Sequence, residues 1–243
     1  MGAIRSKLIK AIKDFSMIRH GDRIAVAVSG GWDSLSLLTL LWQERRAIGC
    51  EYDLLAIHVL GNGAGPWEKP HEPLVRWLEG FKAETGVDYL LAPFLLPEGE
   101  PLPMNCFRCS WNRRKTIFLA AHERGCNKVA FGHHMDDNVE TALLNLFFKG
   151  RLEMMKISSP LFGGVLHIIR PLIYVTKGEI RGFASNRGFP DPPPPCPMAD
   201  HSTRKLMRDM IRSAEMAGFK NAKLNIFRAA LKYSELKGGN DER

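Results

Sequence analysis

The stretch RIAVAVSGGWDSLSLLTLLWQERR, residues 23–46, decides the fold of this chain. Residues 23–29 form a short apolar run that is typical of a strand buried on both faces. The turn SGGWDS follows at residues 29–34, and residues 35–46 have the composition of a helix. A buried strand that passes through a glycine turn into a helix is typical of a parallel βαβ unit.

The same alternation continues along the chain. The sequence predicts further strands over residues 53–60, 89–96, 128–132 and 166–173. It predicts further helices over residues 73–85, 111–124, 136–149 and 176–187. We therefore expect an α/β fold with a parallel sheet and helices on both faces. Ligands bind beyond the carboxyl ends of such strands, so Ser29, His58 and Gly132 are expected to meet in one crevice.

Three segments are expected on this pattern. Residues 1–22 form an N-terminal helix, and residues 23–189 form the α/β domain that carries the candidate site. Residues 190–243 combine a proline-rich segment, which cannot be helical, with a basic helical C-terminal extension. The basic residues near the start of that extension are Arg204, Lys205, Arg208 and Arg212.

Composition limits the class of protein. The chain has 243 residues and a formal charge of +8, which favours a polyanionic partner such as nucleic acid. No run of about 18 apolar residues is present, and the N-terminus lacks the apolar core of a signal peptide. We expect a cytoplasmic protein without a membrane segment.

The turn SGGWDS has the chemistry of an anion site. Its glycines let backbone N–H groups approach a phosphate, and the following helix start adds partial positive charge. A plain turn with Asp33 as helix cap is the simpler interpretation of the glycines alone. The whole hexapeptide resembles the SGGxDS signature of the PP-loop ATP pyrophosphatases. That resemblance implies that residues 23–189 are an ATP-binding catalytic domain, and that Ser29, Gly30, Gly31, Asp33 and Ser34 bind ATP with Mg²⁺.

A second motif, GHHMDDNVET, follows the predicted strand at 128–132. Two acidic residues at a helix start can cap the helix, and two histidines with two aspartates also suggest zinc, although the spacing of a helix-borne zinc pair is missing. The motif looks like the GHxxDDxxET signature of PP-loop enzymes that modify tRNA. This likeness implies that Gly132, His133, Asp136 and Asp137 lie at the ATP site with His58, and that Asp137 is catalytic.

The five cysteines separate into two groups. Cys50 and Cys126 lie among apolar residues and are expected to be buried and inert. Cys106 and Cys109 form a CxxC pair, and Cys196 lies in the proline-rich segment. No second CxxC is present, which disfavours a four-cysteine zinc site. Three thiolates suit either an iron–sulfur cluster with one open iron or a persulfide relay.

Several motifs in order resemble the tRNA 2-thiocytidine synthetases (the TtcA type) over nearly the whole chain. The matching stretches are SGGWDS, CFRCSWNRR, GHHMDDNVETALLNLFFKG, IIRPL, a cysteine after prolines, and IFRA at residues 226–229. This resemblance implies a 4Fe–4S cluster on Cys106, Cys109 and Cys196, which act as metal ligands and in sulfur transfer. It also implies tRNA as substrate and a sulfur donor, either a cysteine desulfurase or sulfide. A homodimer is compatible with the sequence.

Two features depart from that family. The third thiol stands in Cys196-Pro-Met-Ala rather than in a CxxC, and Lys115 follows Cys109 by six residues. Both features look more like the 2-thiouridine enzymes, which carry additional zinc-binding cysteine pairs that this chain lacks. Lys115 is therefore a candidate catalytic residue that contacts the ATP phosphates, or a solvated basic residue. A lysidine-type synthetase and a zinc-stabilised nucleic-acid-binding module would each fit part of the pattern, but the cysteines disfavour the first and the SGGWDS turn disfavours the second.

Overall fold

The structure is a computed structural model that describes residues 2–65, 69–194 and 203–238. Within these ranges six strands form one sheet in the order β3-β2-β1-β4-β6-β5. The strands are β1 (Asp22–Ala27), β2 (Tyr52–Leu60), β3 (Asp88–Pro93), β4 (Lys128–Ala130), β5 (Ser158–Leu161) and β6 (Leu166–Ile169). The first four and β6 are parallel, as the sequence predicts, with Val26 of β1 paired to Ala56 and Ala130 on its two sides.

The strand β5 was not expected and runs antiparallel to β6 at the edge of the sheet. Its sequence, SSPL, lacks the apolar run that identified the other strands. Pro160 removes a backbone donor, which an edge position tolerates. A short turn at Phe162–Gly164 connects the two strands.

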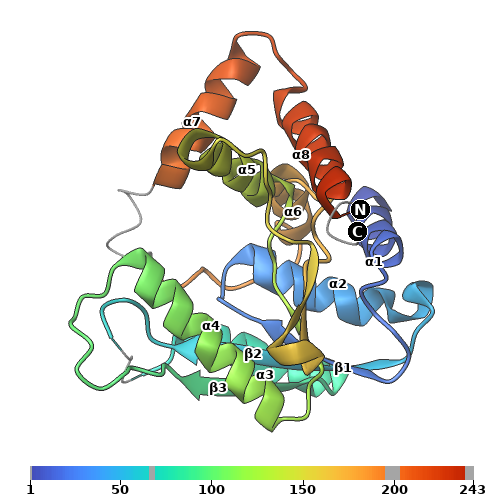
Figure 1. Cartoon of the computed structure of the whole chain (residues 1–243). Helices are drawn as coiled ribbons and strands as arrows, with labels where there is room; N and C mark the ends of the chain where they lie inside the picture. The colour runs from blue at the N-terminus through green and yellow to red at the C-terminus, as the bar shows by residue number, and fades with distance from the viewer. Residues whose placement is uncertain (1, 66–68, 195–202, 239–243) are drawn as a thin grey trace.

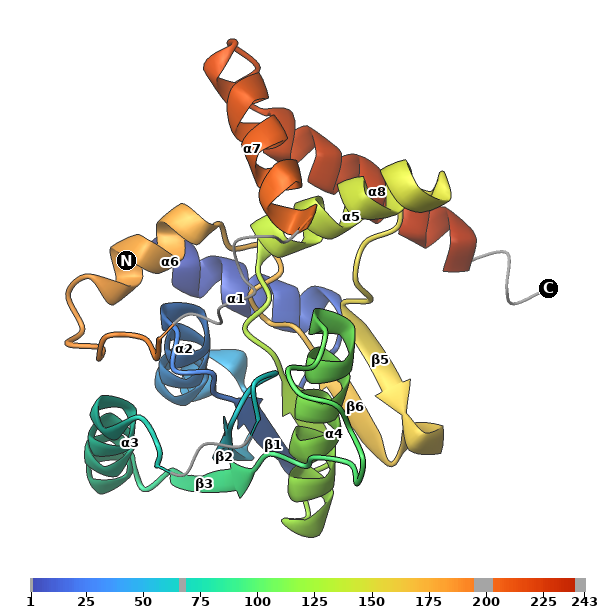
Figure 2. The same cartoon turned by 90° about the vertical axis from the view of Figure 1, so that its left-hand side faces the viewer.

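Helices cover both faces of the sheet. They are α1 (Gly2–Asp14), α2 (Trp32–Ile48), α3 (Glu72–Thr85), α4 (Cys106–Glu123), α5 (Met135–Lys149), α6 (Lys177–Ala184), α7 (Thr203–Met216) and α8 (Ala222–Gly238). Side chains of β1 alternate between two cores, because successive residues of a strand point to opposite faces. Ile24 and Val26 join the core with α1, α2 and α6, whereas Ala25 and Ala27 join the core with α4. Figure 2 shows α4 and α2 on opposite sides of the sheet.

The helix α4 begins five residues earlier than predicted. We expected a helix from Trp111 with the CxxC in the preceding loop, but the helix starts at Cys106. Asn105 caps it, since its side-chain oxygen accepts a hydrogen bond from the N–H of Arg108 at 2.9 Å. Both thiols of the CxxC therefore lie in the first turn of a helix.

The C-terminal extension consists of α7 and α8, which pack on α5 and stand above the sheet domain (Figure 1). Arg208 of α7 bonds Glu140 of α5 at 2.8 Å, and Lys223 of α8 pairs with Asp136 at 2.7 Å. The extension is thus attached to the helix that follows the second motif. No helix in the described part of the chain is long and apolar enough to cross a membrane.

Candidate active site

The SGGWDS turn links the end of β1 to α2, and its serine hydroxyls fix its shape. The Ser34 hydroxyl donates to the Gly31 carbonyl at 2.8 Å and accepts from the N–H of Ser29 at 3.1 Å. Gly30 has a φ of +87°, a conformation that favours glycine. Local hydrogen bonds therefore fix the shape of the turn.

A cavity of 320 Å³ lies at the carboxyl ends of the strands. It brings together seven of the residues proposed from sequence: Ser29, Asp33, Ser34, His58, Gly132, His133 and Asp137. The far wall comes from α4 through Ser110, Arg113 and Arg114. Gly132 allows the two motifs to meet, because a Cβ there would lie 3.1 Å from the carbonyl oxygen of Asp33 and the nitrogen of Ser34.

Other proposed residues lie outside this lining. Lys115 is exposed on α4 and is not part of the cavity wall. Gly30 and Gly31 belong to the SGGWDS turn but do not line the cavity, and Asp136 points instead toward α8. The catalytic role expected for Lys115 stays a prediction.

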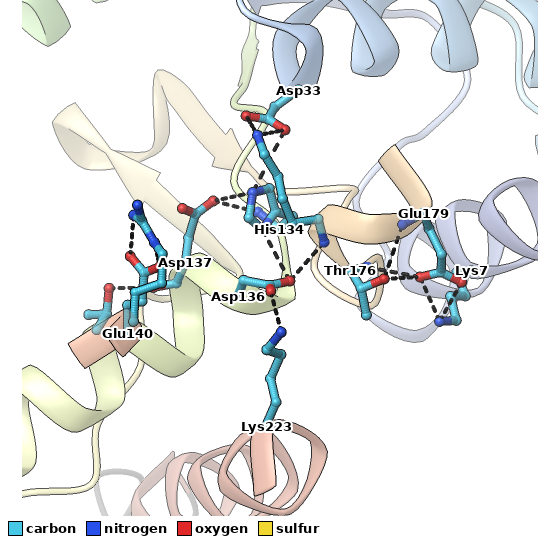
Figure 3. Close-up of polar contacts among 12 residues, drawn as sticks. Lys7, Asp33, His134, Asp136, Asp137, Glu140, Thr176, Glu179 and Lys223 are labelled. Atoms are coloured by element: carbon cyan, nitrogen blue, oxygen red, sulfur yellow. Dashed lines mark hydrogen bonds and ion pairs between the residues drawn. The ribbon is translucent and has the colours of Figure 1, made fainter. Parts of the chain in front are cut away.

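Acidic side chains surround His134, a buried histidine at the start of α5 (Figure 3). Its Nε2 lies 3.7 Å from Asp33 and 3.5 Å from Asp137, and its Nδ1 lies 3.6 Å from Asp136. The backbone N–H of His134 donates to Asp137 at 2.9 Å, which caps the helix as the sequence suggested. Three carboxylates from two strand ends thus converge around one imidazole.

The environment separates the two neighbouring aspartates. Burial raises the pKa of Asp137, and the negative charges of Glu140 and Asp33 add to that rise. Burial would also raise the pKa of Asp136, but Lys223 and the N–H of Lys177 outweigh it and lower that pKa. Asp137, which lines the cavity, therefore accepts a proton more readily than Asp136, which stays ionised.

His133 forms the floor of the cavity beside Arg170, whose Nε donates to its Nδ1 at 3.2 Å. Burial and the charge of Arg170 lower the pKa of His133 to about 3, so the ring is neutral at physiological pH. A neutral ring that accepts at Nδ1 carries its hydrogen on Nε2. His58 is buried and its Nδ1 donates to the Val28 carbonyl at 2.8 Å, so it also fixes the end of β1.

The Cys109 thiol at the start of α4 lies next to the loop that follows β2. A Cβ on Gly63 would lie 3.4 Å from the sulfur of Cys109, so glycine leaves room for this thiol. Cys106 is exposed. Cys196, the third expected ligand, lies outside the described residues, and within them no set of three or more Cys, His, Asp or Glu side chains forms a metal site.

The segment before Cys196 approaches the SGGWDS turn. A Cβ on Gly30 would lie 2.7 Å from the Cδ of Pro193, which precedes Cys196 by three residues. Of the cysteines expected to be inert, Cys126 is buried and burial raises its thiol pKa. Cys50 is only half-buried, because its position after α2 leaves one side open to solvent, which corrects that expectation.

Comparison with known proteins agrees with this geometry. Residues 112–212 match the family model described as a PP-loop domain. The tRNA-cytidine(32) 2-sulfurtransferase of Citrifermentans bemidjiense is 36% identical over 219 residues, which cover 87% of this chain and 83% of that protein. The chain belongs to this family. Its counterpart in Syntrophotalea carbinolica is 37% identical over 209 residues, covering 85% and 80% of the two chains.

A solved structure supports the fold. The U34-tRNA thiolase NcsA from Methanococcus maripaludis, solved with its 4Fe–4S cluster, superposes with a TM-score of 0.75 at 24% identity. The match covers 94% of this chain and 77% of NcsA. This superposition confirms the α/β fold, and the relatives at 36% and 37% identity confirm the resemblance to the PP-loop tRNA thiolases.

Two lysines at the site were not found by sequence reasoning. Lys177, at the start of α6, places its Nζ 2.6 Å from both carboxylate oxygens of Asp33, and its N–H donates to Asp136 at 2.8 Å. Lys223 of α8 reaches Asp136 from the other side, as Figure 3 shows. The capping box of Thr176 and Glu179 marks the start of α6 at Lys177, but it does not indicate the carboxylates that this lysine contacts.

Proposed function

We propose that this chain is an ATP-dependent tRNA sulfurtransferase that replaces the 2-oxygen of a cytidine with sulfur. Family membership at 36% identity over 87% of the chain supports the reaction and the cytidine. The observation that carries the proposal is the cavity in which the SGGWDS turn, the GHHMDD motif and the arginines of α4 meet. A cavity lined by these groups suits a nucleoside triphosphate next to a second substrate.

ATP is expected to bind with its phosphates on the loop between β1 and α2. The start of α2 supplies free backbone donors and partial positive charge, and Arg113 and Arg114 supply full charges from the opposite wall. Lys177 holds the Asp33 carboxylate through an ion pair. When Mg²⁺–ATP binds, we expect Lys177 to turn toward the phosphates and leave Asp33 for the metal ion.

The site has the ligands that Mg²⁺ prefers. Asp33 and Asp137 both line the cavity, and carboxylate oxygens together with phosphate oxygens are the usual Mg²⁺ environment. When bound, the ion would offset the negative charge that develops on the phosphates. His133, neutral and carrying its hydrogen on Nε2, supplies a further donor beside Gly132.

The thiols fit a cluster held at the rim of the same site. Cys106 and Cys109 are adjacent in the first turn of α4, and Arg113 of the same helix lines the cavity. Pro193 at the phosphate loop supports Cys196 as the third ligand, as the family resemblance implies. When bound through three thiolates, an iron–sulfur cluster has one iron open to carry the sulfur that is transferred.

The chemistry follows in two displacements. The 2-oxygen of the base attacks the α-phosphorus of ATP, pyrophosphate leaves, and the oxygen becomes part of an adenylate. A sulfur nucleophile then adds to carbon 2, and AMP leaves with the original oxygen. Loop donors and the arginines of α4 stabilise the charge on the departing pyrophosphate. The substrate we propose is tRNA in the cytoplasm, with sulfide or a cysteine desulfurase as the source of sulfur.

The test is an assay with α-labelled ATP, unmodified tRNA and sulfide under anaerobic conditions. We expect labelled AMP to form only when tRNA is present, with one thiolated nucleoside for each AMP. Formation of ADP, or AMP formation that does not need tRNA, would contradict the proposal. Replacing sulfide by lysine should give no modified base, which separates this reaction from a lysidine-type synthetase.

A further inference from the structure

Arginine side chains line two adjoining depressions away from the strand ends. The first, of 440 Å³, is bordered by Arg5, Arg45, Arg46 and Arg187 around Trp42 and Gln43. The second, of 470 Å³, shares Trp42, Gln43 and Arg187 with the first and adds Arg76 of α3. The two depressions form one surface, here called the arginine groove, between α1, α2, α3 and the segment after α6.

The groove has an excess of positive charge. Its five arginines are accompanied by Glu84 on the wall of the second depression and by Glu44, which is buried beneath the first. Arg5 bonds Glu44, so that carboxylate is already neutralised. The five arginines thus exceed these two carboxylates by three positive charges, and an anion is the ligand that such a surface attracts.

Two of the guanidinium groups, those of Arg45 and Arg187, are held in place before any ligand arrives. Arg45 lies 4.6 Å from the ring centre of Trp42 and donates to the Trp42 carbonyl at 2.7 Å. Arg187 lies 4.0 Å from the ring centre of Phe183. Burial, with a smaller contribution from the charge of Arg5, lowers the pKa of Arg187, and Glu44 partly offsets this shift. Fixed guanidinium forks match phosphate oxygens, and less side-chain freedom is lost on binding.

The position of the groove decides which phosphate compound it suits. Arg45 follows Asp33 by 12 residues on α2, which places it roughly 18 Å along the helix from the phosphate loop. A nucleotide on that loop does not reach so far, whereas a polynucleotide does. Two depressions that share Arg187 also suit successive phosphates better than one isolated anion.

We propose that the arginine groove binds the sugar–phosphate backbone of tRNA at a distance from the base that is modified. This inference rests on the proposed function, because it assigns a second contact surface to the same RNA substrate. Such contacts position the RNA and carry no base specificity. The groove would therefore contribute to affinity for every tRNA and not to the choice of cytidine.

The experiment compares tRNA binding by two double variants across a range of salt concentrations. Arg45→Gln/Arg46→Gln removes two exposed charges from the groove, and Lys13→Gln/Arg124→Gln removes two exposed charges elsewhere. We expect the groove variant to bind tRNA roughly 10-fold to 100-fold more weakly near 0.1 M salt. The slope of log affinity against log salt concentration should be smaller in magnitude by about two. The control variant and the ATP affinity of both proteins should match the wild type.

Three outcomes would overturn the inference. The first is a groove variant that binds tRNA with the wild-type affinity and salt slope. The second is inorganic phosphate that quenches Trp42 fluorescence at sub-millimolar concentration while tRNA leaves it unchanged, which would assign the groove to a free anion. The third is a groove variant that binds tRNA normally but loses thiolation only when a protein supplies the sulfur. That result would make the groove a docking site for an acidic sulfur-donor protein. Wild-type protein that forms no AMP with tRNA would instead refute the proposed function.

Discussion

The nucleotide side and the thiol side of the candidate site are built in different ways. On the nucleotide side, Asp33 and Asp136 follow β1 and β4 and are both bonded by Lys177, at 2.6 Å and 2.8 Å, with His134 between them. On the thiol side, Cys106 is exposed in the first turn of α4, and its expected third partner is 87 residues beyond Cys109. A site at strand ends is set by the sheet, whereas a site shared by distant segments depends on how those segments meet.

The largest effect is expected from Asp33→Ala, which removes the carboxylate that joins the two motifs. We predict at least about 100-fold less tRNA-dependent AMP formation, because one preorganised charged group at the phosphates is lost. Iron content after anaerobic reconstitution should stay at the wild-type value. Asp53→Ala, an exposed aspartate on β2, is the matched control. Loss of iron together with AMP formation would show that the two sides are not separate.

Cys106→Ser tests the separation from the other direction. We expect thiolation and the cluster to be lost while ATP affinity stays within about twofold of the wild type, because the thiol does not line the nucleotide cavity. Cys50→Ser, at a half-buried cysteine outside both sides, should keep cluster and thiolation. A Cys106→Ser protein with full iron content and full activity would show that Cys106 is not a ligand of the cluster.

Lys177→Met tests whether Lys177 contributes to ATP binding on the nucleotide side. The variant leaves the Asp33 charge without its ammonium partner, and we expect ATP affinity measured by calorimetry to fall by about tenfold. Lys177→Arg should recover part of the loss. Lys223→Met breaks the pairing with Asp136 from α8, outside the cavity, and should change ATP affinity less. Equal effects of the two methionine variants would contradict the assigned phosphate contact.

The smallest expected effect is an increase in thermal stability when Asp137 is replaced by asparagine. Burial raises the pKa of Asp137, so its ionised form destabilises the folded chain at neutral pH. Asp137→Asn should raise the melting temperature by a few degrees at pH 7, and the gain should vanish at a pH where the carboxyl is protonated in both states. Asparagine can still accept the bond from the His134 N–H, so the helix cap is kept.

Asp22→Asn provides the contrast for that measurement. Asp22 is buried and pairs with the buried Lys128 at 2.6 Å, so its replacement leaves a cation without its partner. We expect it to lower the free energy of unfolding by about 3–5 kcal/mol. A destabilised Asp137→Asn protein at pH 7 would show that Asp137 is a structural carboxylate like Asp22.

Most of the fold could be predicted because buried parallel strands leave a clear signal. Residues 24–28 are apolar on both faces of the sheet, and the glycine turn after them fixes the start of α2. The edge strand β5 escaped because a half-exposed strand with Pro160 has no such run. The start of α4 was placed late because the cap at Asn105 precedes exposed residues without helical periodicity.

The candidate site was predictable where one motif supplied it. Asp33, Gly132 and Asp137 belong to recognisable motifs at strand ends, and they line one cavity. Lys177 and Lys223 were not predictable, since each reaches an aspartate of another segment across more than 80 residues of sequence. A lysine in a helix turn carries no mark of the carboxylate that it will meet in the fold.

The most direct test of the proposed function is nucleoside analysis of tRNA after reaction with the reconstituted protein, ATP and sulfide. Unmodified tRNA transcripts that carry either cytidine or uridine at position 32, where the named relatives act on cytidine, would serve as substrates. Mass spectrometry of the digested tRNA should detect 2-thiocytidine at that position in the first transcript and no thiolated nucleoside in the second. Formation of 2-thiouridine, or no thiolated base from a protein with full cluster content, would contradict the account.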